Sequence, residues 1–357
     1  MRAILILTAS FVCQAQMFPF PGPGSVTAGT NGFSKVVRLT SNHTLVGATM
    51  TQPILLYINN PVFKSVANGG YVQSPTADDV VAFSDPNCIT QLPNELVPGT
   101  WSATAGTAEA YAKPSLSSTV DVSVYVCVGH PSPPARSTGV FSGFYSVYHF
   151  ADGTTLSFAD ASGNGRTGTN VSAFAAAGKI DGGAAFAGAA TIHSSMGYLT
   201  TFGISAWFAT SNGNQASYRT ILDRENGAPP RNFFLGLDTA GKAFLTWSVG
   251  GNPSACAITG TGVRLDDNAW HHLAGTYDGT TAILYVDGAS AGSAACGTPD
   301  DPTGVDFFMA ESLGGILPLT GSMDEVRTNT TAWVSGQITT DYNSQNSPST
   351  FWTVTVL

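Results

Sequence analysis

Short apolar runs separated by turn residues recur along most of this chain, a pattern typical of β-strands. It is clearest in residues 265–288, where an aromatic-rich run at 270–277 is followed by Asp278-Gly279 and a second run at 282–286. Glycine tolerates positive φ at such a turn, and an aspartate can hydrogen-bond its own backbone there. The segment is therefore predicted to be a β-hairpin.

The N-terminal half shows the same pattern with shorter runs. Valines alternate with other residues from 120 to 128, which places five of them on one face of a strand. We expect a β-sandwich with strands at 35–39, 54–58, 80–83, 108–112 and 120–128.

In the C-terminal half, apolar runs recur every ten to fifteen residues or so. Ser335 can cap a short helix, with Ile338 and Tyr342 on one face. The expected architecture is two curved antiparallel sheets. Strands are predicted at 144–150, 184–186, 203–208, 218–222, 233–237, 243–249, 270–276, 282–286, 306–310 and 321–326.

Two proline-rich stretches punctuate the chain, one at 17–24 and one at 130–138. The first reads as an exposed leader or linker and the second as a domain boundary. The predicted organisation is a signal peptide at 1–15, a leader at 16–32, an N-terminal β-sandwich domain at 33–138, a second sandwich domain at 139–347 and a C-terminal tail at 348–357.

The first fifteen residues resemble a short signal peptide, with Arg2, an apolar run to Val12, and small residues Cys13 and Ala15. Cleavage before Gln16 would give a secreted or cell-surface protein. A buried N-terminal strand is the alternative, and a lipoprotein anchored at Cys13 is disfavoured by the preceding valine. No later apolar run reaches the ~18 residues of a membrane span.

Composition narrows the possible partners. Charged residues make up only 10% of the chain, against about 25% in a typical soluble domain. The formal net charge is −9, and there is no run of lysine or arginine. Nucleic acid and anionic membrane are therefore not expected partners.

Cysteine usage agrees with export. Removal of the first fifteen residues leaves four cysteines, two in each predicted domain. Cys88 with Cys127 and Cys256 with Cys296 are the natural disulfide pairs, and unpaired buried cysteines are the alternative. The chain has no CxxC motif or close Cys/His cluster for zinc.

Several blocks in fixed order resemble the LamG-like jelly roll of the concanavalin A-like lectin/glucanase superfamily. The resemblance spans roughly residues 145–347. Its blocks are Tyr148-His149-Phe150, residues 160–165, 178–186 and 204–207, Trp270-His271-His272, residues 284–288, 321–327 and 342–345. The preceding half is similar to a bacterial domain of unknown function that often accompanies such jelly rolls. The implied fold class is all-β, with two antiparallel β-sandwich domains, the C-terminal one concanavalin A-like.

Glycoside hydrolysis is the sharpest catalytic hypothesis, because catalytic members of the wider superfamily place two carboxylates on one strand face. The nearest acidic pair in the sequence, Asp324-Glu325, is adjacent, so its side chains should point to opposite faces of a strand. Asp266-Asp267 fails for the same reason. We therefore expect no enzyme activity, with no catalytic residues.

His271 and His272 are also adjacent, so one is expected inside and one at the surface. Trp207 and Trp270 are expected in the core. Exposed aromatic residues that could stack on a sugar are fewer, and the candidates are Trp247, Tyr198 and Tyr218.

Calcium is the cofactor that the resemblance implies. LamG-like jelly rolls commonly hold calcium near the rim, where the first and last strands lie side by side. Oxygen ligands there could come from Asp160, Asn164 and Asp324. The alternative is that Asp160 and Asn164 form a turn, while Asp324 pairs with Arg327.

The predicted function is that of an exported, non-catalytic binding protein that recognises a glycan or a cell-surface protein. By family analogy, binding would use rim loops near 212–218, 225–231 and 300–304. A structural or adhesive component of the cell surface is the alternative, and a glycoside hydrolase is a further one. The ligand itself is not predicted.

Overall fold

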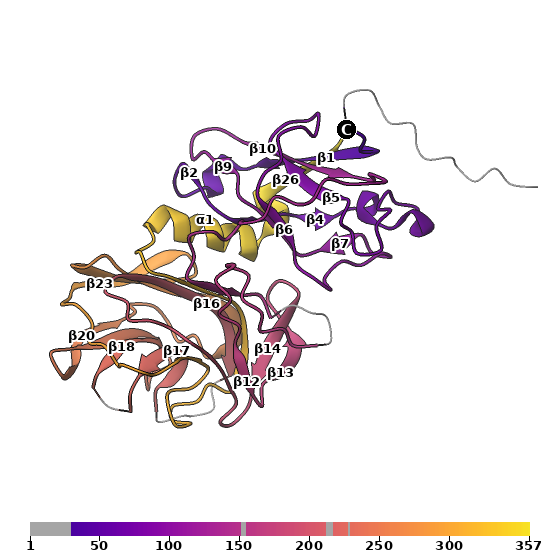
Figure 1. Ribbon diagram of the computed structural model, residues 1–357. Coiled ribbons are helices and arrows are strands. Elements are labelled where there is room, and N and C mark those ends of the chain that lie inside the picture. Colours follow the sequence, from indigo (N-terminus) through magenta and orange to yellow (C-terminus); the bar gives the residue numbers. More distant parts are fainter. Residues whose placement is uncertain (1–29, 151–154, 212–216, 228) are drawn as a thin grey trace, which may run out of the picture.

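The structure is a computed structural model that describes residues 30–150, 155–211, 217–227 and 229–357. It is almost entirely antiparallel β-structure, as predicted (Figure 1). The predicted signal peptide and most of the predicted leader lie outside these residues. In the ranges given above, no helix has the length and apolar character needed to cross a membrane.

The N-terminal half is built around a four-stranded sheet in the order β26-β1-β10-β5. Its strands are β1 (Lys35–Ser41), β5 (Val80–Phe83), β10 (Ser123–Val128) and β26 (Trp352–Val356). Smaller ladders pack against it: β2 (Met50–Thr51) with β9 (Ser115–Leu116), β8 (Ala110–Ala112) with β3 (Ile54–Leu55) and β6 (Asn94–Leu96), and β4 (Ile58–Asn59) with β7 (Thr107–Ala108). Three short 3-10 turns connect them, at His43–Leu45, Pro61–Phe63 and Val66–Asn68.

The C-terminal half is a sandwich of two sheets. The first sheet has the order β13-β14-β25-β16-β21-β22-β23, with β11 also paired to β25. Its strands are β11 (Ser146–Tyr148), β13 (Phe174–Ala177), β14 (Gly182–Phe186), β16 (Phe202–Ser211), β21 (Asp267–Tyr277), β22 (Thr281–Val286), β23 (Ala289–Ala295) and β25 (Gly321–Asn329).

The second sheet has the order β12-β15-β24-β17-β18-β19-β20. Its strands are β12 (Thr169–Val171), β15 (Thr191–Ser194), β17 (Arg219–Glu225), β18 (Arg231–Leu237), β19 (Ala243–Val249), β20 (Asn252–Thr259) and β24 (Phe307–Met309). The predicted hairpin at 270–286 is present as β21 and β22, with Tyr277 opposite Ala282 beside the turn.

Alternation along the strands explains the core of this sandwich. In β18, Phe233, Leu235 and Leu237 point into one apolar cluster, which also receives Leu245 and Trp247 from β19. Residues between them face outward, as a period of two requires. The two sheets therefore bury one face each and leave two outer faces.

The valine-rich strand is shorter than predicted. β10 begins at Ser123, and Val120 is exposed while Val124 and Val126 are buried. The Ser117 hydroxyl accepts hydrogen bonds from the backbone N–H groups of Thr119 and Val120, which holds this segment in a turn.

The predicted helix is present as α1 (Ser335–Asn346), which lies between the two halves (Figure 1). Ser335 is its first helical residue, and the capping position belongs to Val334, which makes no side-chain cap. Ile338 is buried, and the Tyr342 ring stacks on Trp207 of β16, with ring centroids 5.5 Å apart.

The residues predicted to be a C-terminal tail are part of the fold. They form α2 (Pro348–Phe351) and β26, and β26 pairs antiparallel with β1 from Ser41 opposite Trp352 to Val37 opposite Val356. Trp352 is 2% exposed, and its indole Nε1 donates to the Leu55 carbonyl at 2.8 Å. Burial of this indole and the open edge of β1 explain why the segment is ordered.

Both predicted disulfides are formed. Cys88–Cys127 joins β10 to the turn after β5, and Cys256–Cys296 joins β20 to the residue after β23. Because β20 and β23 belong to different sheets, the second bond links the two layers of the sandwich at one edge.

The C-terminal strand β26 should contribute to stability through Trp352. Trp352→Ala should lower the free energy of unfolding by about 3–5 kcal/mol, because it removes a buried indole that packs in the N-terminal core. Val356→Ala, in the same strand but exposed, should change it by less than about 0.5 kcal/mol. Urea unfolding followed by fluorescence measures both, and equal effects would contradict the assigned role of Trp352.

Candidate functional site

The two outer faces of the C-terminal sandwich differ in what covers them. Helix α1 and the N-terminal half lie against the sheet that contains β16 and β23, whereas the sheet that contains β17, β18 and β20 faces away from them (Figure 1). We call the outer surface of this second sheet the open face. It is the face of the sandwich that α1 and the N-terminal half leave uncovered.

Aromatic side chains gather on the open face. Tyr218, just before β17, is 37% exposed and contacts Phe234 of β18 and Phe244 of β19, with ring centroids 6.2 and 5.1 Å away. These three residues line a hollow of about 150 Å³. Its remaining walls are Arg231, Thr246, Pro253, Ser254 and Leu317.

A second hollow of about 220 Å³ adjoins the first, because Arg231 and Pro253 line both. Its other lining residues are Glu225, Gly227, Pro229 and Ile316. The predicted binding loop at 225–231 therefore borders this site. The predicted loop at 212–218 lies mostly outside the described residues.

Two carboxylates of β17 meet one guanidinium here. Arg231 Nη2 pairs with Glu225 Oε2, and Arg231 Nε lies 3.4 Å from Asp223 Oδ1. The Ser312 hydroxyl donates to the other oxygen of Asp223. Both carboxylates are buried, whereas Arg231 is partly exposed beside the hollows.

The expectation that no two carboxylates share a strand face is therefore corrected. Sequence reasoning considered adjacent acids and missed the pair Asp223 and Glu225. The spacing of two residues, which puts side chains on one side of a strand, is the signal that could have found it. Arg231, from the next strand, could be placed between them only by the pairing of β17 with β18.

Burial raises the pKa of Asp223, Arg231 opposes this, and the nearby Glu225 raises it as well, with a net value of about 8. The Asp223 carboxyl is thus able to hold a proton near neutral pH.

The covered face of the sandwich contains a second cluster of charges, shaped by an irregularity in β25. The pairing of β25 with β16 shifts between Ser205 and Trp207, and Glu325 has φ 50°. Met323 and Val326 point into the core. Asp324 and Glu325 both lie outside it, so the prediction that they point to opposite faces is wrong, because a β-bulge interrupts the alternation.

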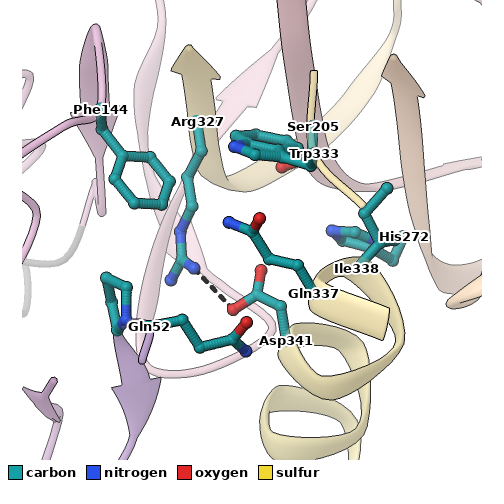
Figure 2. A pocket seen from close by; sticks show the side chains of 10 residues that line it. Gln52, Phe144, Ser205, His272, Arg327, Trp333, Gln337, Ile338 and Asp341 are labelled. Carbon is teal, nitrogen blue, oxygen red and sulfur yellow. Dashed lines mark hydrogen bonds and ion pairs between the residues drawn. The ribbon is translucent and has the colours of Figure 1, made fainter. Parts of the chain in front are cut away.

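Glu325 is at the centre of this cluster. Its Oε1 lies 2.5 Å from His149 Nδ1, and its Oε2 lies 2.5 Å from Arg327 Nη2. Arg327 also pairs with Asp341 of α1 at 2.6 Å, an interaction visible in Figure 2. Burial by itself would raise the pKa of Glu325, but interactions with His149 and Arg327 outweigh it and lower this pKa to about 2.

This cluster has no room for a substrate. The crevice beside Arg327 and Asp341 has a volume of about 20 Å³, which is enough for a single water (Figure 2). Side chains from both halves close it, including Gln52 and Phe144 on one side and Trp333 and Ile338 on the other. We interpret the cluster as an interdomain contact.

Glu109, His149 and Glu325 bring three potential metal-ligand atoms within 4.8 Å of one another. The 2.5 Å between His149 Nδ1 and Glu325 Oε1 is a hydrogen-bond distance. Two ligands of a tetrahedral zinc ion, each about 2.0–2.1 Å from the metal, would be roughly 3.3 Å apart. His149 and Glu325 are therefore spaced as a hydrogen-bonded pair, and Glu109 Oε1 lies farther from His149 Nδ1, at 3.4 Å.

The residues predicted to bind calcium are saturated by other partners. Asp160 accepts backbone hydrogen bonds from Val147, Ser162 and Arg166 at 2.9–3.0 Å. Asp324 Oδ2 accepts from the N–H groups of Lys179 and Ile180.

Asn164 uses its amide to donate to the carbonyls of Phe144 and Tyr145. Among the contacts of the described residues, none joins Asp324 to Asp160 or Asn164. The strands β11 and β25 do lie side by side, and calcium binding by the three side chains stays a prediction.

The two adjacent histidines lie in different environments. His272 is buried under α1, where burial lowers its pKa to about 3, and His271 lies partly exposed between Asp267 and Asp287.

The aromatic candidates also differ in burial. Trp207 is buried, and Trp247 is also buried in the core, so it is not a sugar-stacking residue. Tyr198 is 39% exposed, and its hydroxyl donates to Pro299.

Comparison with solved structures gives weak global similarities. The binding domain of Paraclostridial Mosquitocidal Protein 1 aligns with 57% of this chain at 13% identity and a TM-score of 0.47. The botulinum neurotoxin type G receptor binding domain aligns with 57% at 14% identity and a TM-score of 0.44. This chain covers 52% of each of those two domains, about half their length.

A further similar structure is domain 4 of AbnA, a GH43 extracellular arabinanase from Geobacillus stearothermophilus, in complex with arabinotriose. It aligns with 56% of this chain at 20% identity and a TM-score of 0.44, and 97% of that domain is covered. No curated protein matches the sequence. No family match supports the resemblance of the N-terminal half, which stays a prediction.

The sequence of the C-terminal sandwich matches a family. Residues 181–339, from just before β14 into α1, match the Laminin_G_3 family, described as the concanavalin A-like lectin/glucanases superfamily. The antiparallel sandwich and this match agree, so the C-terminal half of this chain has the concanavalin A-like jelly-roll fold.

Proposed function

We propose that this chain is an exported, non-catalytic protein that binds carbohydrate on the open face of its C-terminal sandwich. The observation that carries the proposal is the aromatic hollow of Tyr218, Phe234 and Phe244 beside Arg231. An aromatic ring offers a flat apolar surface to a sugar, and charged or polar groups at its edge can hydrogen-bond the hydroxyls. The signal-like first fifteen residues support export.

Arg231 supports recognition more than catalysis. Its guanidinium occupies the space between Asp223 and Glu225 and lies 5.3 Å from the centre of the Phe234 ring. A glycosidase needs that space for the scissile bond, with its two carboxyl groups roughly 5–9.5 Å apart. Arginine donors on the rim of a hollow can instead reach sugar hydroxyls.

The proposal predicts that Tyr218→Ala weakens glycan binding by about tenfold or more, equal to ~1.4 kcal/mol, because it removes the exposed ring of the hollow. The matched control is Tyr198→Ala, since Tyr198 has nearly the same exposure, 39% against 37%, and does not line the hollow. A polysaccharide and glycan array identifies a ligand, and calorimetry with that ligand measures the affinities.

Equal affinities for the two variants would place binding elsewhere on the molecule. If no glycan binds, the structural or adhesive role at the cell surface becomes the better hypothesis, and the search moves to protein partners.

Calcium binding would raise the melting temperature of the protein. We expect less than about 1 °C difference in the melting temperature between calcium and a chelator, because backbone N–H groups already occupy the oxygens of Asp160 and Asp324. Glycan binding should likewise be unchanged by the chelator. A calcium-dependent shift that disappears in Asp160→Asn and Asp324→Asn would restore the calcium site.

The carboxylate pair on the open face predicts a pH dependence of stability. The folded-state pKa of Asp223, about 8, lies above its value of ~3.9 in the unfolded chain. Its contribution to stability is therefore fully present below about pH 4 and is lost as the pH rises through about 8. Asp223→Asn should lose less stability than the wild type between about pH 5 and about pH 9 in urea unfolding.

The opposite pH trend would show that Arg231 holds Asp223 ionised in the fold. The same variant also tests catalysis: turnover of a bound oligosaccharide that is abolished in both Asp223→Asn and Glu225→Gln would replace the binding proposal by a glycoside hydrolase.

A further inference from the structure

A larger cleft lies between the two halves, away from the open face. Its volume is about 270 Å³, and residues of β3, β4 and β7 form one wall, while the β13–β14 turn and the end of α1 form the other. One wall thus comes from each half of the chain, and nothing in the proposed function uses this space.

Glu109, between β7 and β8, lines this cleft and is buried. Among the described residues, its Oε1 has no hydrogen-bond donor. Glu109 Oε1 lies 3.4 Å from His149 Nδ1, but that nitrogen is closer to Glu325 Oε1, at 2.5 Å, and makes its hydrogen bond there. A buried carboxyl without a donor is costly, and such groups are uncommon in folded proteins.

The electrostatics of Glu109 reinforce this observation. Burial, followed by the nearby carboxylates of Glu325 and Asp324, raises its pKa well above the usual range. A positive charge placed beside the carboxyl would oppose these effects by favouring its ionised form. The cleft therefore offers a site where a cation is favoured.

The other charged groups of the cleft also favour a positively charged ligand. Asp181, exposed at the β13–β14 turn, makes no side-chain hydrogen bond or ion pair with any described residue. Lys179 is already engaged, because its Nζ donates to Asn346 at 2.8 Å and lies 4.5 Å from the centre of the Trp207 ring. Neither contact pairs Lys179 with Glu109 or Asp181, and the cleft thus has two carboxyl groups against one ammonium group.

The walls between these charges are apolar. Leu56, Ile58, Ile180 and Pro348 line the cleft beside the polar groups. Such a surface suits the methylene stem of a long basic side chain, which buries its carbon atoms and keeps only its charged head polar. The volume of about 270 Å³ is close to the lower end of the roughly 300–1,000 Å³ of ligand pockets, so one side chain fits better than an extended ligand.

We propose that this interdomain cleft binds an arginine or lysine side chain of a partner polypeptide, with Glu109 as the buried counter-ion and Asp181 as a second acidic contact at the entrance. The stem packs on the apolar walls, and the charged head supplies the donors that Glu109 lacks. This site is separate from the open face, so glycan binding neither supports nor excludes it.

The test uses the full chain with N-acetyl-L-arginine amide and, as a neutral probe of nearly the same shape, N-acetyl-L-citrulline amide. Titration followed by nuclear magnetic resonance should show at least about tenfold tighter binding of the arginine probe. Asp181→Asn should weaken arginine binding about threefold or more, and Glu109→Gln should reduce it to the level of citrulline. Glu311→Gln is the matched control, since Glu311 is also buried with an unpaired oxygen but does not line the cleft.

Equal binding of the two probes, or no binding of either, would overturn the proposal and leave Glu109 as a protonated acid at the interdomain contact. Glu109→Gln could also loosen that contact, so its melting temperature is measured beside the wild type. If it unfolds, Asp181→Asn decides the question, because Asp181 is exposed and unpaired: unchanged arginine affinity in that variant would contradict the assigned site.

Discussion

The ion pairs of Arg327 connect the parts of this molecule. The guanidinium lies between Glu325 of its own strand and Asp341 of α1, and it is almost completely buried. It therefore fixes α1 against the sandwich, and the chain that follows α1 returns to the N-terminal half as β26. The position of the last strand, and with it the shape of the interdomain cleft, depends on this contact.

Buried ion pairs of this kind contribute little net stability, but breaking one of them is costly. Their desolvation cost offsets much of the Coulomb attraction, but loss of one partner leaves a charge stranded and typically costs about 3–5 kcal/mol. The cluster around Glu325 has too few hydrogen-bond donors for its carboxylates. His149 pairs with Glu325, and Glu109 Oε1 has no donor among the described residues. The same arrangement that joins the halves thus creates the uncompensated carboxyl that we assign to a ligand.

Helix α1 covers one face of the sandwich, so the binding proposal concerns the other face. Trp207 and His272 occupy the covered face under Tyr342, so these aromatic residues are structural. The corresponding aromatic residues of the open face, Tyr218 and Phe244, remain within reach of solvent. Similar side chains on two sheets of one sandwich therefore have different roles, and the difference comes from α1.

The strands that sequence patterns predicted in the C-terminal half are mostly those in which nearly every residue is buried, such as β14, β16 and β17. The strands they missed include the sheet edges β12, β13, β20 and β23, where most residues are exposed and the alternation is weak. In the same way, the Asp324-Glu325 pair was misjudged because a bulge cannot be seen in a period of two.

The sequence by itself determined the all-β class and the central hairpin, because strand alternation and turn residues are local properties. The cysteine count favoured the two pairs that form, with unpaired cysteines as the alternative. Only the tertiary structure decided that Arg231 separates Asp223 from Glu225, that Glu109 meets His149, and that residues 352–356 complete the first sheet. Each of these contacts joins two segments, and the local sequence of one segment does not identify the other as its partner. For Trp352 and its partner strand, more than three hundred residues of chain lie in between, so the pairing depends on how both halves fold and pack.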